Sequence, residues 1–187
     1  MRFGEVVATG EAVGATSSRT AKAEALADLL RRTPAGEVEA TVGFLVGEPR
    51  QGRIGVGFRT LASATDGLAP ARESTLEVAE VDDALTTLAG LAGPGSAAAR
   101  TRLLADVIGR ATAGEAAFLN RLIGGELRQG ALAGVMGDAV ARAAEVPATV
   151  VRRAVMLGGR LDEVVRIALV EGRVGLDEVA LEVGRPL

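Results

Sequence analysis

Residues 114–144 read GEAAFLNRLIGGELRQGALAGVMGDAVARAA, and this stretch decides the fold class. Its first half places Phe118, Leu119 and Leu122 at the spacing of one face of an α-helix. Its second half repeats that spacing with Leu132, Val135 and further apolar residues to Val140. The glycine-rich segment 124–130 separates the two halves. The stretch therefore predicts two helices joined by a glycine turn.

The same periodicity continues in both directions from this stretch. Helices are predicted at about 18–32, 34–46, 58–65, 81–92, 96–111, 147–158 and 161–170. Glycine and proline at 47–53 and 93–95 interrupt the pattern, and no segment shows convincing strand alternation. The chain is therefore expected to be all-α, a single compact domain of about ten helices.

Within that domain, the weakly periodic segment 66–80 is interpreted as a linker with a little extended structure. It divides the chain into a helical lobe at about 1–65 and a second lobe at about 81–175. The tail 176–187 mixes apolar residues with charges and is expected to run extended.

Composition excludes several kinds of chemistry. The 187 residues contain no cysteine and no histidine, which removes disulfides, thiolate ligands and the commonest general base. Four phenylalanines are the only aromatic residues, too few for a platform that stacks bases. The net charge is −3, so any site for an anion must be a local patch.

No signal peptide or long apolar span is recognisable, so the chain is expected to be cytoplasmic. Asp82 and Asp83 form the only pair of adjacent aspartates and are interpreted as residues of a helix start. No other carboxylates have the spacing of metal ligands. We therefore predict no catalytic residue, no metal site and no cofactor in this chain.

Three segments combine a helix start with a basic side chain. They are 16–19 with Lys22, 93–96 with Arg100, and 124–130 with Arg128. The N-terminus of a helix offers unpaired N–H groups and the positive end of its dipole to a phosphate. Ordinary capping explains each segment about as well: Thr16, Ser17 or Ser18 can cap the first helix, Ser96 is expected as the second N-cap, and Gly124 or Gly125 can end a helix. Both interpretations stay open on this evidence.

In their order and spacing, these segments resemble the N-terminal DNA-binding domain of ATP-dependent DNA ligases. The resemblance rests on the basic helix 18–31, the Ile-Gly-Val-Gly element 54–57, Gly95-Ser96 with Arg100, and Gly-x-Leu-Arg-x-Gly at 125–130. The final Gly-Arg-Pro-Leu, 184–187, is similar to the link into the catalytic core of that family. The resemblance thus covers nearly the whole chain.

The resemblance implies an all-helical domain that grips the minor groove on both sides of a nick, largely through the sugar-phosphate backbone. By analogy, the residues expected to contact DNA are Arg19, Lys22, Gly95, Ser96, Arg100, Gly125, Arg128 and Gly130. The last glycine motif would lie closest to the groove. Glu126 and Leu132 depart from the family pattern, and a carboxylate at 126 would repel phosphate.

The adenylation motif of the family, Lys-x-Asp-Gly, has no counterpart here. Lys22 is the only lysine and is followed by Ala23-Glu24-Ala25. The resemblance therefore implies a monomeric, nucleoid-associated binding domain that catalyses nothing alone. ATP, Mg²⁺ and the catalytic domain would belong to a larger parent ligase acting in repair, replication or recombination. The alternative is a helical protein-interaction module that does not bind DNA.

Overall fold

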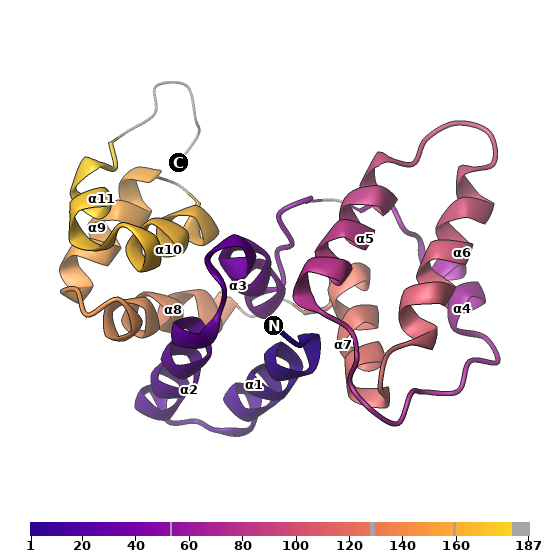
Figure 1. The fold of residues 1–187 in the computed structure, drawn as a ribbon, viewed down its shortest axis with the longest axis horizontal. Helices are drawn as coiled ribbons and strands as arrows, with labels where there is room; N and C mark the ends of the chain where they lie inside the picture. Colours follow the sequence, from indigo (N-terminus) through magenta and orange to yellow (C-terminus); the bar gives the residue numbers. More distant parts are fainter. Residues whose placement is uncertain (53, 128–129, 159, 181–187) are drawn as a thin grey trace.

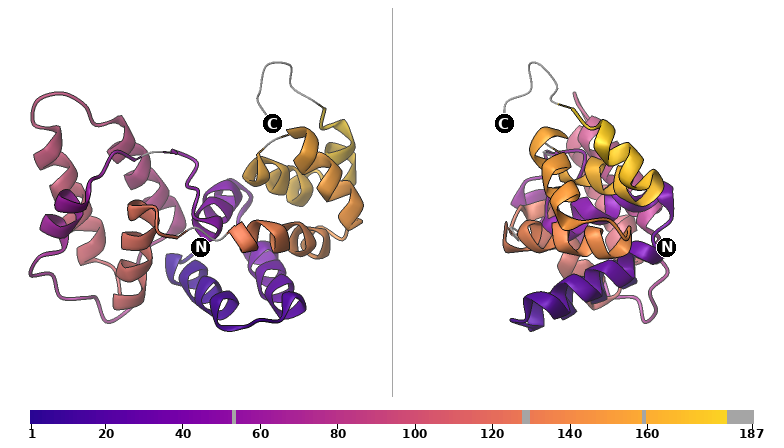
Figure 2. Two further views of the ribbon diagram at one scale, coloured as in Figure 1. Left: turned by 180° about the vertical axis from the view of Figure 1, so that it is seen from behind. Right: turned by 90° about the vertical axis from the view of Figure 1, so that its left-hand side faces the viewer.

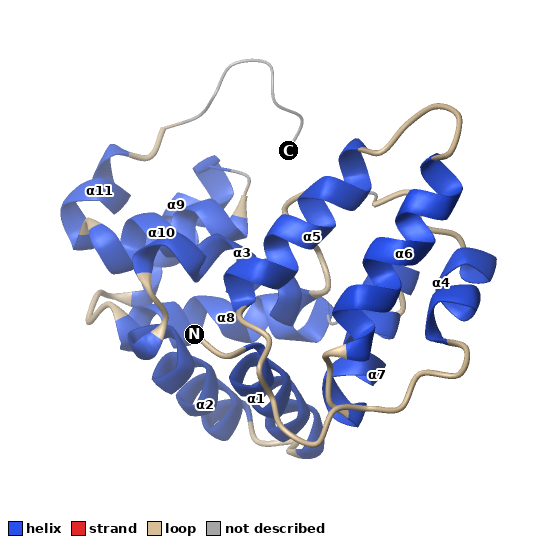
Figure 3. Cartoon of the chain, turned by 45° about the vertical axis from the view of Figure 1, so that its right-hand side comes forward, coloured by secondary structure: helices blue, strands red, loops and turns tan. Residues whose placement is uncertain are grey.

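The computed structural model describes residues 1–52, 54–127, 130–158 and 160–180. Over these ranges the chain is helical, with loops between the helices and no strand (Figure 3), so the predicted all-α fold is confirmed. One short 3-10 helix, Ala35–Glu37, precedes α3. The α-helices are α1 (Phe3–Ala15), α2 (Arg19–Arg32), α3 (Val38–Val46), α4 (Phe58–Thr65), α5 (Val78–Gly90), α6 (Ser96–Gly109), α7 (Ala113–Gly124), α8 (Gly130–Ala143), α9 (Ala148–Gly158), α10 (Leu161–Val170) and α11 (Gly172–Glu178).

The helices form two groups that lie side by side (Figure 1). The larger group combines α1–α3 with α8–α11, and its most extensive contacts are those of α2 with α8 and of α3 with α10. The smaller group consists of α4–α7, in which α6 packs on α4, α5 and α7. Contacts of α1 with α7 and of α3 with α5 join the two groups.

This grouping differs from the division into lobes 1–65 and 81–175 predicted from the sequence. The helix α4 packs with α6, and the helices α8–α11 return to pack on α1–α3. The physical reason is that periodicity identifies the apolar face of a helix but carries no information about which helix covers that face.

Three phenylalanine rings lie where the two groups meet. The Phe3 ring contacts Phe44 of α3 at 5.8 Å and Phe118 of α7 at 5.7 Å between centroids, both edge to face. All three side chains are buried. Edge-to-face pairs add about 0.5–1.5 kcal/mol each beyond the burial of their area. The first turn of α1 therefore anchors both groups to one aromatic cluster.

The predicted linker 66–80 is attached to that same turn. The Phe3 N–H donates to the Leu76 carbonyl at 2.8 Å, and the Val78 N–H donates to the Met1 carbonyl at 3.0 Å. Helix α5 begins at Val78 with a capping box formed by Glu77 and Glu80. The last three residues of the predicted linker are thus helical.

At the other end of the chain, the expectation of an extended tail from residue 176 is wrong for its first residues. Helix α11 includes Gly172–Glu178, and Leu176 is fully buried. Residues 181–187, which carry the predicted Gly-Arg-Pro-Leu link, lie outside the described residues.

The chain passes between the two groups twice, as the view from behind shows (Figure 2). The first crossover runs from Gly47 to Gly57, between α3 and α4, and the second leads from the end of α7 to the start of α8. The second crossover is the glycine-rich segment singled out in the sequence. These two segments are the framework of the candidate site.

Candidate nucleic-acid interface

The second crossover begins with a glycine turn that ends α7. Gly125 has φ +72°, its N–H donates to the Leu122 carbonyl at 3.3 Å, and the Glu126 N–H donates to the Arg121 carbonyl at 2.9 Å. This is the Schellman arrangement, in which a left-handed glycine satisfies the last helical carbonyls. Gly125 therefore ends α7, as the capping interpretation holds. This role of its backbone does not determine what the surface of the turn contacts.

Of the other residues in this motif, Gly130 is the first residue of α8. Arg128 lies outside the described residues. Leu127 is buried in the core, and Glu126 is exposed. The motif thus begins at the turn that ends α7 and finishes at the first residue of α8.

The same turn occurs at the end of α3. Gly47 has φ +77°, its N–H donates to the Phe44 carbonyl at 3.3 Å, and the Glu48 N–H donates to the Gly43 carbonyl at 2.8 Å. The sequences also match, because Gly-Glu-Pro-Arg-Gln-Gly at 47–52 differs from Gly-Glu-Leu-Arg-Gln-Gly at 125–130 only in its third residue. This repeat was visible in the sequence and was missed there.

The two turns touch each other. A Cβ atom placed on Gly47 would lie 2.2 Å from the Leu127 carbonyl oxygen, so only glycine fits at this position. A Cβ placed on Gly125 would meet no heavy atom within 4 Å among the described residues. The two crossovers are therefore packed against each other on the Gly47 side and open on the Gly125 side.

An ion pair fixes the first crossover to α5. The Arg50 Nε donates to both carboxylate oxygens of Asp82, at 2.9 and 2.8 Å, and its Nη2 also donates to Asp82. Gln51 Nε2 donates to the same carboxylate at 2.7 Å. The hydrogen bonds that Arg50 donates to Asp82 raise the pKa of the Arg50 guanidinium. Helix α5 begins at Val78, so Asp82 lies in its second turn. The interpretation of Asp82 as a residue of the helix start is therefore wrong.

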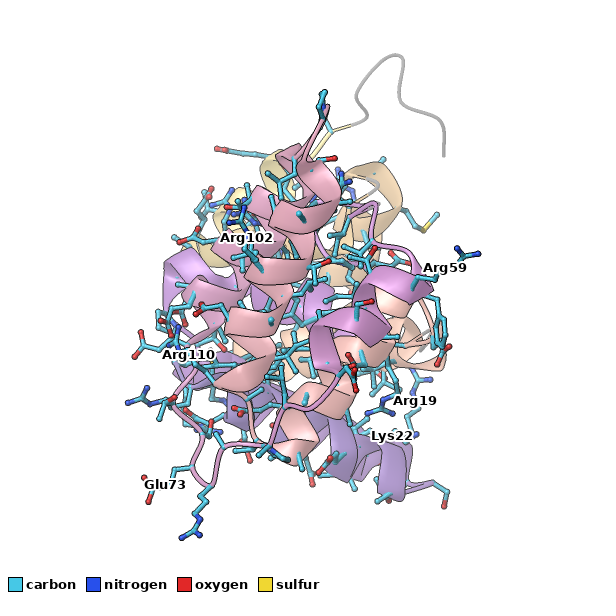
Figure 4. All side chains as sticks on the ribbon, turned by 90° about the vertical axis from the view of Figure 1, so that its right-hand side faces the viewer. Arg19, Lys22, Arg59, Glu73, Arg102 and Arg110 are labelled. Carbon is cyan, nitrogen blue, oxygen red and sulfur yellow. The ribbon has the colours of Figure 1, made fainter. Side chains whose placement is uncertain are left out.

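The predicted basic residues of α2 lie at the surface. Of the three residues that could cap this helix, Ser18 is the N-cap, and its hydroxyl accepts from the Ala21 N–H. Arg19 is 63% exposed and donates to Asp138 of α8 and to the Gly134 carbonyl. Lys22 is half-buried and forms no ion pair with the described residues. Both side chains extend to the same side of the molecule in Figure 4.

The predicted segment 93–96 has a different geometry. Gly95, with φ +83°, is the N-cap of α6, and Ser96 is the first helical residue, so the prediction of Ser96 as N-cap is wrong by one position. Arg100 donates to the Leu91 carbonyl and so closes the α5–α6 loop. Its Nη2 also lies 3.6 Å from the Cβ position of Gly55 in the first crossover.

The structure therefore brings the predicted residues together only in part. The α5–α6 loop, with Gly95 and Ser96, lies at the end of the smaller group remote from α2 (Figures 1 and 2). Arg100 is partly buried and directed to its own loop. Arg19 and Lys22 instead share their side of the molecule with an arginine that the sequence analysis did not select.

That arginine is Arg59, in the first turn of α4. It is exposed, forms no ion pair with the described residues, and projects on the same side as Arg19 and Lys22, whereas Arg102 and Arg110 lie on the other side (Figure 4). Its neighbour Phe58 also lies at the surface and is 86% exposed. The signal in the sequence was an arginine two residues after the Ile-Gly-Val-Gly element.

None of the helices in the described ranges has the length and apolar character needed to cross a membrane.

Comparison with known proteins finds a family match to part of the chain and relatives along its whole length. Residues 62–141 match the family described as DNA ligase N terminus. All 187 residues align with a probable DNA ligase from Rhodococcus jostii (strain RHA1) at 49% identity, covering 37% of that protein. Probable DNA ligases from Pseudarthrobacter chlorophenolicus and Anaeromyxobacter sp. are each 47% identical over the whole chain, which covers 36% of their length.

The chain thus spans little more than a third of the relatives that it matches. The matched family region begins in α4 and ends in α8, and it includes the second crossover. The resemblance drawn from the sequence motifs is confirmed: this chain is similar along its whole length to probable DNA ligases, and its residues 62–141 match the family described as DNA ligase N terminus.

Proposed function

We propose that this chain binds double-stranded DNA around a nick, through the sugar-phosphate backbone and the minor groove, without sequence preference. The observation that carries the proposal is the placement of Arg19, Lys22 and Arg59 on one side of the molecule (Figure 4). Arg19 and Lys22 belong to the larger helix group and Arg59 to the smaller one. The two glycine crossovers run between these groups.

The electrostatics of this arrangement suit a backbone-directed contact. The chain carries a net charge of −3, so binding depends on a local cluster of cations. Arginine and lysine contacts to phosphates position a protein on a duplex without reading its sequence. The open side of Gly125 allows backbone to approach a groove wall closely, since glycine has no side chain in the way. The exposed Glu126 opposes binding and limits its strength.

We assign the chemistry of ligation to the remainder of a parent ATP-dependent DNA ligase. In that assignment ATP and Mg²⁺ bind to the catalytic part, which is also the protein partner of this domain. Lys22 is half-buried on α2 and lacks the Asp-Gly that follows an adenylated lysine. The domain contributes DNA binding to repair, replication or recombination, and its association with the nucleoid follows from that binding.

The test is fluorescence anisotropy of a labelled nicked duplex titrated with the chain at several salt concentrations. The logarithm of the affinity should fall linearly with the logarithm of salt concentration, since phosphate contacts release counterions. Arg128→Ala should weaken binding and lower that slope by about one. Arg102→Ala removes an exposed arginine from the opposite side and should leave the affinity unchanged.

Absence of binding at low salt would refute DNA binding and favour the helical interaction module. Binding that is equally strong in Arg128→Ala would contradict the role given to the glycine motif.

A further inference from the structure

Asp138 of α8 lies between two arginines from different helices. Arg19 of α2 donates to its Oδ2 from Nε at 3.0 Å and from Nη2 at 2.8 Å. On the other side, Arg152 Nη1 of α9 lies 3.7 Å from its Oδ1. The side chains of Arg19 and Arg152 are 63% and 60% exposed, while that of Asp138 is 30% exposed. Two outward guanidinium groups are thus oriented by one partly covered carboxylate.

The charge balance of this triad is unusual among the described ion pairs. Arg31 with Asp28, Arg110 with Glu80, and Arg173 with Asp177 each neutralise one charge with one charge. Arg166 contacts both Glu39 and Glu171 and leaves an excess of negative charge. The triad of Arg19, Asp138 and Arg152 carries one excess positive charge.

The triad also keeps hydrogen-bond donors available. Within the described residues, Arg19 Nη1 donates no hydrogen bond, and Arg152 donates none from any of its nitrogens. Exposed ion pairs contribute little to the stability of a fold. A gain in stability is therefore a weak explanation for the two arginines at this position. Guanidinium groups with free donors and excess charge suit the oxygens of a phosphate.

We propose that Arg19 and Arg152 bind one backbone phosphate of DNA together, and that Asp138 is the positioning residue that holds both guanidinium groups. This inference rests on the proposed function and extends it, because Arg152 belongs to α9 and to none of the segments predicted to bind. It continues the contact from α2 across α8 to α9, which pack side by side in that order. The larger helix group then contacts the duplex through α9 as well as α2.

The first experiment replaces Arg152 in the 187-residue chain and titrates the labelled nicked duplex. Arg152→Ala should weaken binding several-fold at moderate salt and lower the salt slope by about one. Arg173→Ala is the matched control, since it removes an equally exposed arginine from an ion pair on α11. It should change neither the affinity nor the slope.

A second variant separates positioning from simple charge. Asp138→Asn removes a negative charge near the phosphate, so a purely electrostatic cluster would bind DNA more tightly. If Asp138 orients the guanidinium groups, Asp138→Asn should instead bind several-fold more weakly, with an unchanged melting temperature. Combining Arg19→Ala with Arg152→Ala should cost less than the sum of the two single losses, because both contact the same phosphate.

The outcomes distinguish this inference from the proposed function. If the wild-type chain binds DNA and the Arg152→Ala variant has the same affinity and salt slope as Arg173→Ala, the inference is overturned and the proposed function stands. Tighter binding by Asp138→Asn would overturn the positioning role. No wild-type binding at low salt would overturn both.

Discussion

The turns at Gly47 and Gly125 share a sequence and a backbone geometry but differ in what lies against them. Each glycine has a left-handed φ, and each turn closes its helix with the same pair of hydrogen bonds. Gly47 faces the Leu127 carbonyl, whereas nothing described lies within 4 Å of the Cβ position of Gly125. Helix termination thus explains both glycines equally, and packing explains only the first.

The difference teaches how one motif can serve two purposes in one chain. At Gly47 the close approach is to another segment of the same molecule, and this contact holds the crossovers together. At Gly125 the space for a close approach is present without an occupant from the described residues. Substitution of each glycine therefore tests whether the open turn receives a partner.

The largest effect is expected for Gly47→Ala. The new Cβ would sit 2.2 Å from the Leu127 oxygen, and the left-handed φ adds strain of its own. Because both clashing groups are backbone-bound, the crossovers must separate, and we expect a loss of at least about 3 kcal/mol in unfolding free energy. Urea denaturation followed by circular dichroism measures this loss. A loss of about 1 kcal/mol would show that the turns separate easily.

The next effect concerns the arginine of the first turn. Arg50→Ala would leave the buried Asp82 carboxylate with Gln51 as its remaining side-chain partner from that crossover. Losing the partner of a buried charge is destabilising, and we expect about 2 kcal/mol because Arg50 itself is partly exposed. The same denaturation experiment applies to Arg110→Ala, whose exposed pair with Glu80 should contribute under about 0.5 kcal/mol. Equal losses in the two variants would contradict an anchoring role for Arg50.

Helix α1 marks the limit of what periodicity could predict about the fold. Residues 3–15 include three glycines and three valines, which lower intrinsic helix propensity, and no helix was predicted there. Tertiary contacts stabilise it, since Phe3, Val6, Val7 and Val13 are buried. A Cβ on Gly10 would already lie 3.4 Å from the Phe118 ring, so its glycine permits the approach of α7. The sequence shows these glycines but not the partners that require them.

The sequence predicts a site residue correctly where the position of that residue in its helix determines whether its side chain is exposed. Arg19 directly follows the N-cap of α2 and extends into solvent, whereas Arg100 lies one turn into α6 and turns back to the Leu91 carbonyl. Both fitted the same pattern of a helix start followed by a basic residue. Their difference depends on which face of each helix is packed, and that is a tertiary property. The same property leaves the apolar side chain of Phe58 exposed.

A smaller effect on stability than for Gly47→Ala or Arg50→Ala, and the sharpest effect on function, is expected for Gly125→Ala. The substitution introduces a left-handed alanine with no clash among the described residues, which costs about 1 kcal/mol. Gly172→Ala is its control, since that glycine also has positive φ and no neighbour within 4 Å of its Cβ position. If Gly125 only ends α7, both variants should bind the nicked duplex like the wild type, after correction for the unfolded fraction. If the open turn lies against the duplex, Gly125→Ala alone should lose affinity several-fold, because the added methyl group would occupy the space that the DNA requires. The pair of variants thereby measures the contribution of the open turn separately from the cost of its backbone geometry.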